Sequence, residues 1–235
     1  MTTQQIMAEL QSMGSESTKR IFLNHGAKEP LFGVKVQDLK KIQKKVRKDY
    51  ALSLELFQTG NSDAQYLAGL IADEGKMTKE DLRAWAHGAG WHMVSEYTVP
   101  WIAAESHHGF DLALEWIDAV GAHLQAAGWS TLSSLASIKK DSELDLDTFK
   151  SLLNRVEKEI HKAPNRVRYV MNGFVIATGC FIPALTSEAM QAGKAIGQVS
   201  VEMGGTSCKV PNAPEYIQKI IDKGSIGKKK KMARC

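Results

Sequence analysis

Apolar residues along this chain recur every three or four positions, which is the spacing of one face of an α-helix. Two of these stripes lie in the first 50 residues. They consist of Ile6, Leu10 and Met13, and of Val36, Leu39, Ile42 and Val46. No segment shows the regular alternation of apolar and polar residues that is typical of a β-strand. The pattern therefore predicts an all-α chain.

Besides the helix that carries Val36 to Val46, twelve helices are predicted from the same spacing and from residues that start or stop helices. They cover residues 3–13, 15–24, 52–59, 63–73, 79–87, 91–105, 110–126, 129–138, 146–161, 165–181, 187–199 and a last helix that begins after Asn212 and ends near Lys223. Ser15 and Asn212 are good N-caps, and Thr78 with Asp81 forms a capping-box pattern. Helices paired in units of about 35 to 40 residues resemble a HEAT-like solenoid. We expect one HEAT-like repeat domain over residues 1–224.

The segment from residue 225 to residue 235 differs in composition from the helices before it. It contains glycine, four consecutive lysines (228 to 231) and no apolar anchor. Such a segment does not order itself by burying apolar surface. We therefore predict a basic, mobile tail.

The stretch from His87 to Ala103 carries the most distinctive local pattern. Gly88 and Gly90 break a helix, and the next helix is expected to begin near Trp91. Pro100 lies too far inside it for a first-turn proline, so it either kinks this helix or separates two short ones. Trp91 then stands either beside the free backbone donors of a helix start, which suit an anion, or simply in the core.

Charge is segregated along the chain. Residues 15–50 hold ten Lys or Arg against four Asp or Glu, and residues 209–235 hold eight against two, so each block carries +6. Residues 51–208 carry −7, and the whole chain carries +4. Lys40, Lys41, Lys44 and Lys45 lie off the apolar stripe of their helix. Two basic blocks are typical of a binder of nucleic acid or of an anionic surface, although solvated charged faces would have the same composition.

Other classes of protein receive no support from the sequence. Cys180, Cys208 and Cys235 are odd in number and lack Cys-x-x-Cys spacing, and the adjacent pair His107 and His108 is poorly placed for one metal ion. We expect neither metal nor other cofactor. The chain contains no run of about 18 apolar residues and no secretory leader pattern, so we expect a cytoplasmic protein without a membrane span. We also expect a monomer.

Two motifs resemble those of the AlkD-like DNA alkylation repair family of HEAT-like repeat proteins. The first is Phe32-Gly33-Val34 followed by the cationic helix, and the second is the run from Trp91 to Pro100. Trp129 and Asn172-Gly173-Phe174 are supporting matches, and the resemblance spans roughly residues 19–181. It implies a curved solenoid whose concave, basic face holds duplex DNA. Active members of this family are glycosylases that release 3-methyl or 7-methyl purines.

The resemblance also implies site residues. It maps two aromatic residues that contact the DNA onto Trp91 and Phe174, the catalytic Asp onto Ser95, and a DNA-gripping Arg onto Leu132. Glycosidic bond cleavage develops positive charge, which a carboxylate stabilises. Ser95 carries no charge and Leu132 cannot bind phosphate, so the chain departs from the family at both positions.

Glu96 is the nearby alternative carboxylate. The chain has one residue more between Val94 and Pro100 than the family pattern. One helical step turns a side chain by about 100°, so Glu96 would need a local bulge to reach the position of the catalytic Asp. Otherwise Glu96 is a solvated residue favoured by the helix dipole.

The sequence thus leads to one main hypothesis and two alternatives. The main hypothesis is a DNA-binding member of the family that holds duplex DNA on a concave basic face, with base-excision activity left open because Ser95 and Leu132 stand at the positions of the catalytic Asp and Arg. Its contacts to DNA are assigned to Trp91, Ser95, Phe174, Lys40, Lys41, Lys44, Lys45, Lys228, Lys229, Lys230 and Lys231. The alternatives are an alkylpurine glycosylase that uses Glu96 and a protein-interaction solenoid.

Overall fold

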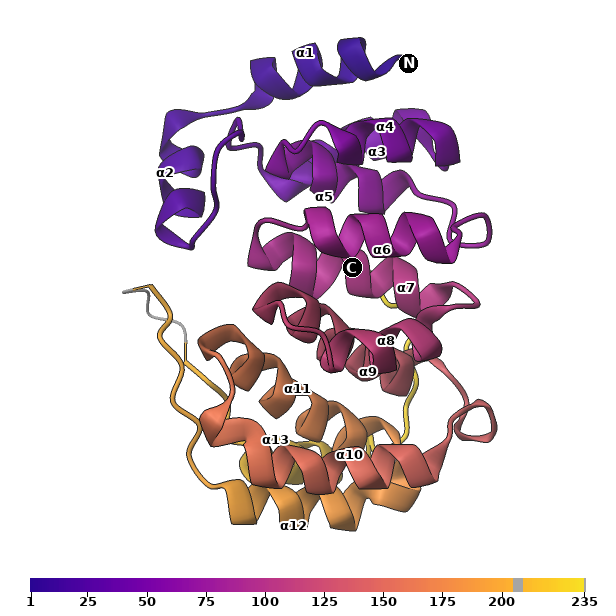
Figure 1. Cartoon of the computed structure of the whole chain (residues 1–235), viewed down its shortest axis with the longest axis vertical. Helices are drawn as coiled ribbons and strands as arrows, with labels where there is room; N and C mark the ends of the chain where they lie inside the picture. The colour runs from indigo at the N-terminus through magenta and orange to yellow at the C-terminus, as the bar shows by residue number, and fades with distance from the viewer. Residues whose placement is uncertain (205–208, 235) are drawn as a thin grey trace.

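The computed structural model describes residues 1–204 and 209–234, and in these ranges it contains helices and no strand. Thirteen α-helices follow one another along this part of the chain (Figure 1). They are α1 (Thr3–Met13), α2 (Glu16–Asn24), α3 (Val36–Val46), α4 (Tyr50–Gln58), α5 (Ser62–Ile71), α6 (Lys79–Gly88), α7 (Val99–Glu105), α8 (Gly109–Ile117), α9 (Ala122–Ile138), α10 (Leu146–Glu159), α11 (Asn165–Phe181), α12 (Thr186–Ile196) and α13 (Ala213–Asp222). Short 3₁₀ turns follow α9, α10 and α11, and the π-helix η1 (Val94–Thr98) precedes α7. The predicted all-α class is confirmed.

Several helix starts follow from local capping that the sequence predicted. The Ser15 side chain accepts a hydrogen bond from the Thr18 amide, and Asn212 accepts one from the Glu215 amide. Thr78 and Asp81 form the reciprocal capping box at the start of α6. These bonds satisfy amides that have no partner within the first helical turn, which is why the helices begin where they do.

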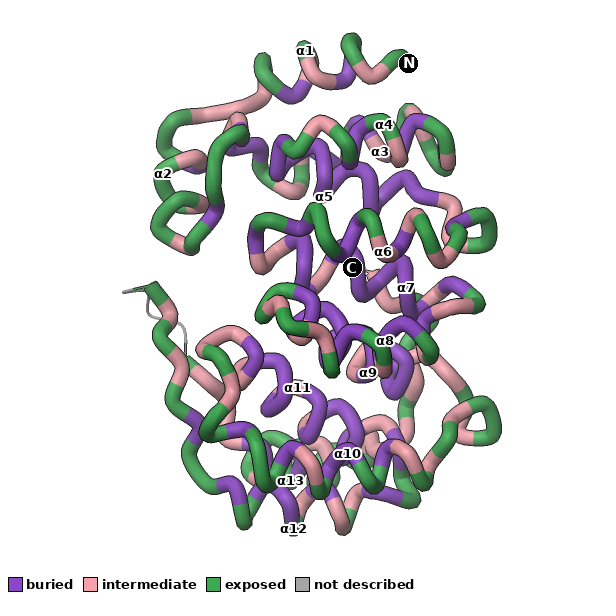
Figure 2. The backbone as a smooth tube through the Cα atoms, in the orientation of Figure 1, coloured by how far each residue is buried: buried purple, intermediate pink, exposed green. Residues whose placement is uncertain are grey.

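The helices form two rows. In the inner row, α3, α5, η1 with α7, α9 and α11 each pack against the next, while α4, α6, α8 and α10 form the outer row in front of them (Figure 1). Burial follows this arrangement from α5 onwards, because α5, α7, α9 and α11 are mostly buried, whereas α3 and the outer helices expose one face (Figure 2). Two outer-row ion pairs, Lys79 with Asp111 and Arg83 with Glu115, both join residues 32 positions apart. Equivalent positions in successive repeats therefore face each other.

The hydrophobic core extends along the stack of helices, and neighbouring parts of it share a helix. One side of α8 packs Leu112 and Trp116 into the core of the first half, and its other side packs Ala113 and Ile117 into the core of the second half. A helix that serves two cores is the signature of a solenoid, in which no repeat buries its apolar face alone.

The boundary between α8 and α9 differs from the prediction. The sequence placed a break near Gly128, between helices 110–126 and 129–138. The chain instead breaks before Gly121, and Gly128 lies inside α9. A Cβ atom at Gly128 would lie 2.8 Å from the Ala113 carbonyl oxygen. This glycine therefore serves the close approach of α8 to α9 and does not end a helix.

Residues 225–234 also differ from the prediction. They run as an extended segment along the inner row, here called the strap, and they are held by hydrogen bonds to α5, α7, α9 and α11. The segment that the sequence predicted to be a mobile tail therefore lies against the repeats in this structure. Ala233 packs against the core, and the other contacts of the strap are polar, because its backbone amides and cations bind carbonyls and carboxylates. The hydropathy of the sequence does not reveal this polar anchoring.

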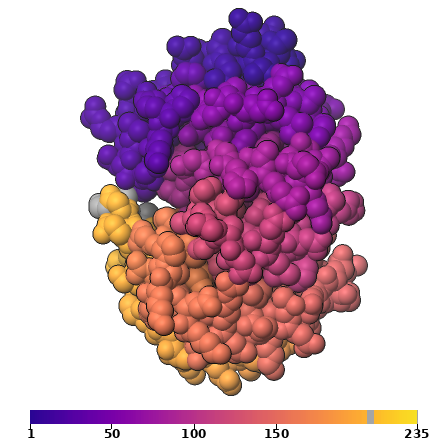
Figure 3. Space-filling model, viewed as in Figure 1, coloured from indigo at the N-terminus to yellow at the C-terminus, as the bar shows by residue number. Residues whose placement is uncertain are grey.

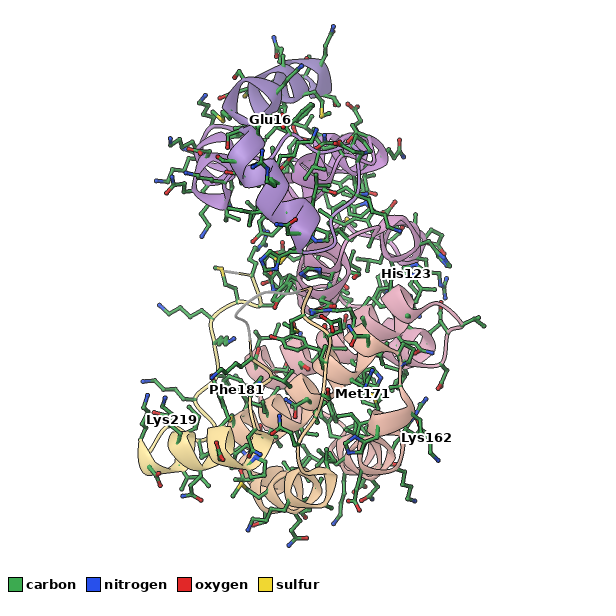
Figure 4. All side chains as sticks on the ribbon, turned by 90° about the vertical axis from the view of Figure 1, so that its left-hand side faces the viewer. Glu16, His123, Lys162, Met171, Phe181 and Lys219 are labelled. Carbon is green, nitrogen blue, oxygen red and sulfur yellow. The ribbon has the colours of Figure 1, made fainter. Side chains whose placement is uncertain are left out.

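The N-terminal region and the chain before α13 approach each other at one edge. A Cβ atom on Gly204 would lie 2.8 Å from the Asn24 carbonyl oxygen. Figure 3 shows the two surfaces close together at the left edge of the molecule. In the view from that edge, α2 with Glu16 lies above α13 with Lys219, and Phe181 lies on the opposite side from His123 and Lys162 (Figure 4).

Among the described residues, no single helix is long and apolar enough to cross a membrane. The two segments 165–181 and 183–196 meet the length and composition requirement only as a pair bent by 116°. No cluster of potential metal ligands occurs in residues 1–204 and 209–234. Cys180 is buried with a free thiol, whereas Cys208 and Cys235 lie outside the described residues.

We expect the Ile42→Asp variant to lose more than about 3 kcal/mol of folding free energy. Ile42 is fully buried on the core side of α3, so the substitution removes an apolar side chain and buries a charge in its place. Urea unfolding measures the loss. Lys41→Asp introduces the same residue at the neighbouring exposed position and should shift stability little. Equal effects of the two variants would contradict the placement of the Ile42 stripe.

Candidate nucleic-acid interface

A groove of about 260 Å³ lies on the inner row of helices. Its walls come from η1, α7, α9, α11 and the strap. Its polar residues are Glu96, Tyr97, Ser130, Ser133, Ser134, Ser137, Tyr169 and Lys230. Four serines at helical spacing place hydroxyl groups along one side of α9. The groove thus crosses several repeats, and Trp101, Val170 and Phe181 add apolar surface beside these hydroxyl groups.

Glu96 reaches this groove because the helix is locally widened. Residues 94–98 form a π-helix, which accommodates one extra residue in the turn before Pro100. Pro100 itself lies in the first turn of α7, where its missing amide donor costs no hydrogen bond within the helix. The local bulge that Glu96 would need is therefore present, and Ser95 does not line the groove.

Both oxygens of the Glu96 carboxylate bind the guanidinium group of Arg166. The Arg166 Nε atom lies 2.7 Å from Glu96 Oε1, and Nη2 binds Oε2. The Glu96 side chain is 2% exposed, and burial raises the pKa of its carboxyl above the usual range although Arg166 opposes this effect. The fork geometry matches a carboxylate and leaves Glu96 no free negative charge.

Arg166 was not identified from the sequence. Its guanidinium carbon lies 4.5 Å from the centre of the Tyr169 ring, and Nη1 lies 3.6 Å from the Met203 sulfur. A cation in the first turn of a helix is unfavourable beside the helix dipole. Arg166 at the second residue of α11 was therefore a sequence signal for an acidic partner, but only the fold identifies that partner as Glu96, 70 residues away.

The structure separates the aromatic residues that the resemblance grouped. Phe174 has no exposed surface and packs between the rings of Phe149 and Trp129. Trp91 is 6% exposed, and its indole nitrogen donates a 3.1 Å hydrogen bond to the His25 carbonyl oxygen. The core alternative therefore describes both residues better than a DNA contact does.

Ser95 and Leu132, which match the catalytic Asp and the DNA-gripping Arg, are also buried. Ser95 is 3% exposed and Leu132 is fully buried. Restoring Asp and Arg at these positions would bury two charges in the core and destabilise the fold. Direct contact of Ser95 or Phe174 with DNA is inconsistent with their burial in this structure.

The Phe32-Gly33-Val34 motif has a structural role. The three backbone amides donate hydrogen bonds of 2.6, 3.0 and 2.9 Å to the Asp63 carboxylate at the start of α5. Gly33 adopts φ +77°, and a Cβ there would lie 2.4 Å from the Lys19 amide nitrogen. Burial raises the pKa of Asp63 against these three bonds. The motif thus joins the segment before α3 to α5.

The predicted lysines divide into two groups. Lys41, Lys44 and Lys45 are exposed on α3, with Lys41 bound to Asp38 and Lys45 bound to Glu9, while Lys40 is half-buried. In the strap, Lys228, Lys230 and Lys231 are exposed. Lys229 is half-buried and binds Asp141 at 2.8 Å and the Ala136 carbonyl oxygen at 2.9 Å. Lys229 therefore anchors the strap, whereas the other three lysines of the strap are accessible.

A second cavity, of about 230 Å³, lies beside η1 and is mainly apolar. Phe22, Tyr66, Trp91 and His92 contribute to its wall. Burial, together with the positive charges of Arg166 and His25, lowers the pKa of His92 to about 4. His92 is therefore neutral at pH 7.

His92 should make stability depend on pH. Its folded pKa of about 4 lies below the unfolded value of 6.5, so the unfolded chain binds the proton more readily and stability falls as pH decreases from 6.5 towards 4. We expect His92→Gln to lose less stability between pH 7 and pH 5 than the wild type, as measured by urea unfolding. The His107→Gln variant changes an exposed histidine and should behave like the wild type. Identical pH dependence in all three proteins would contradict a buried, neutral His92.

Comparison with known proteins gives consistent results. The family model described as DNA alkylation repair enzyme matches residues 6–179. An uncharacterized protein of Listeria innocua is 34% identical over 224 residues, which cover 93% of this chain and 96% of that protein. An uncharacterized protein of Listeria monocytogenes is 33% identical over the same proportions.

One solved structure is similar over the entire length. It aligns with a TM-score of 0.91 and 36% sequence identity and covers 100% of both chains. It is described as a member of a new family of proteins related to the HEAT-like repeat DNA glycosylases with affinity for branched DNA structures. The HEAT-like repeat fold expected from the sequence is thereby confirmed.

Proposed function

The chain belongs to the DNA alkylation repair family, and we propose that it binds DNA along its inner face without excising bases. The observation that carries this proposal is the Glu96–Arg166 pair. A glycosylase needs a carboxylate whose negative charge faces the developing positive charge of the sugar. Here the only carboxylate that lines the groove in the described residues is neutralised by a bidentate guanidinium.

Branched DNA is the class of ligand that we favour. The similar solved structure is described as belonging to a family with affinity for branched DNA structures, and the present chain matches it from end to end. The exposed lysines of α3 and of the strap supply the positive charge that phosphates require. The groove beside the strap carries serine and tyrosine hydroxyls, which suit contact with a sugar–phosphate backbone.

Base excision remains the second candidate because of the π-helix. This widened turn brings Glu96 to the groove, which is the condition that the enzymatic alternative imposed. Catalysis would require Arg166 to leave the carboxylate when DNA binds. The protein-interaction alternative has no comparable observation in its favour, and a steep salt dependence of DNA binding would separate it from the other two.

Methylated-purine release tests the proposal directly. We expect the wild-type protein to bind DNA and to release no 3-methyl or 7-methyl purine above a protein-free blank, because both Glu96 oxygens bind Arg166. Chromatography of the released bases measures this. Glu96→Gln is the control, since release that disappears in this variant would make Glu96 the catalytic carboxylate and overturn the proposal.

The cationic helix tests the DNA-binding face. Reversal of Lys41, Lys44 and Lys45 to Glu should weaken binding to a branched junction at least about tenfold at moderate salt, because three attractive charges become repulsive. Fluorescence anisotropy measures the affinity, and circular dichroism should show unchanged helix content. Reversal of Lys150 and Lys158 in α10 and of Lys162 in the 3₁₀ turn after it changes net charge by the same amount and should have a much smaller effect. Equal losses in the two variants would show that α3 has no special role.

A further inference from the structure

The strap crosses several repeats in a fixed register. The Gly227 amide donates to the Cys180 carbonyl oxygen at the end of α11 at 2.9 Å, and the Lys230 amide donates to the Ser137 carbonyl oxygen at the end of α9 at 2.8 Å. Further along, the Ala233 amide donates to Glu105 Oε1 at 2.7 Å at the end of α7. The strap thus follows the C-terminal ends of the inner helices, where unpaired carbonyl groups and the helix dipoles favour donors and cations.

Arg234 ends the strap in a nearly closed acidic site. Its side chain is 10% exposed, and Nη2 lies 2.7 Å from Glu74 Oε2 and 3.0 Å from Glu105 Oε2. Its Nη1 lies 3.5 Å from the carbonyl oxygens of Gly69, Leu70 and Ala72 at the end of α5. One guanidinium therefore joins α5, the segment after it and α7, and all of its partners carry full or partial negative charge.

The same site connects the two basic blocks of the sequence. Glu74 also binds the ammonium group of Lys48, which follows α3 directly. The carboxyl-terminal block therefore meets the amino-terminal block at one carboxylate, although Lys48 and Arg234 are far apart in the chain. Glu74 and Glu105 neutralise the junction and allow two cationic segments to lie close together.

The outward side of the strap is cationic. Lys228, Lys230 and Lys231 are exposed, and the Lys230 ammonium lies 5.5 Å from the centre of the Phe181 ring at the groove. Lys230 and Ala233 contribute to the groove wall. A segment that competes with DNA for the inner face would carry negative charge, as DNA does. This strap carries the opposite charge and attracts phosphates.

We propose that residues 225–234 form a clasp, locked by Arg234, that joins the basic blocks of the two chain ends into one continuous phosphate-binding track along the inner face. This inference rests on the proposed DNA binding and adds to it the contacts that hold the strap in place. Arg234 is a positioning residue, because its guanidinium is enclosed by protein groups and acts on DNA only through the strap.

Limited trypsin digestion tests the clasp without DNA. Trypsin cleaves after Lys228 to Lys231 only when the strap leaves the body, so cleavage reports on local opening. We expect Arg234→Gln to accelerate this cleavage at least about tenfold relative to the wild type. Lys219→Gln removes one positive charge from an exposed site on α13 and should leave the rate unchanged. Equal rates in all three proteins would overturn the clasp.

DNA binding tests the track. Replacing Lys228, Lys230 and Lys231 by Gln, with Arg234 intact, should reduce the slope of log affinity against log salt by about 2 to 3, because each lost phosphate contact contributes about 0.9. Arg234→Gln should lower affinity several-fold, more than Lys219→Gln does, although Arg234 itself makes no phosphate contact. Arg234→Lys keeps the charge and should restore part of the affinity.

Truncation after Gly224 distinguishes a track from a lid. Weaker binding with a reduced salt slope supports the track. Tighter binding would show that the strap covers the DNA site, and unchanged binding would show that it lies outside the interface; either result overturns the proposal. If the wild type fails to bind any DNA, the proposed function fails, while the trypsin experiment still decides whether the clasp exists.

Discussion

The stacking of one helix pair on the next is the constraint on which the rest of this structure depends. No pair buries its apolar face alone, so α8 contributes to the cores on both of its sides and Gly128 allows α9 to approach it closely. The same stacking aligns the inner helices with their C-terminal ends along one side. A groove and a row of carbonyl groups both follow from this alignment, and they provide the binding sites for the strap.

The π-helix at η1 and the Glu96–Arg166 pair belong together. The extra residue before Pro100 widens the turn and brings a carboxylate to the groove, and Arg166 occupies that carboxylate with two hydrogen bonds. At this widened turn Glu96 lines the groove and Ser95 does not. The Arg166 guanidinium then determines the role of Glu96. A carboxylate that is paired with a guanidinium stabilises the local fold and is not available to stabilise the positive charge that develops on a sugar.

Electrostatic anchoring explains why the basic ends of the chain do not repel each other. Glu74 binds both Lys48 and Arg234, Glu105 also binds Arg234, and Asp141 binds Lys229. The acidic residues in the middle of the chain are therefore not spread evenly over its surface. Some of them lie at the points where the cationic strap contacts the repeats, and this leaves the remaining lysines of the strap exposed.

The sequence by itself determined the all-α class, the capped helix starts at Ser15, Thr78 and Asn212, and the segregation of charge, because these depend on neighbours within a few residues. It also identified the family through short motifs. Only the tertiary structure decided that Phe174 and Ser95 are buried and that Gly128 allows close contact between two helices. It also decided that Arg166 binds Glu96 and that the basic tail forms the strap. Each of these depends on partners tens of residues away, and helical periodicity specifies which face of a helix is buried but not which distant residue covers it.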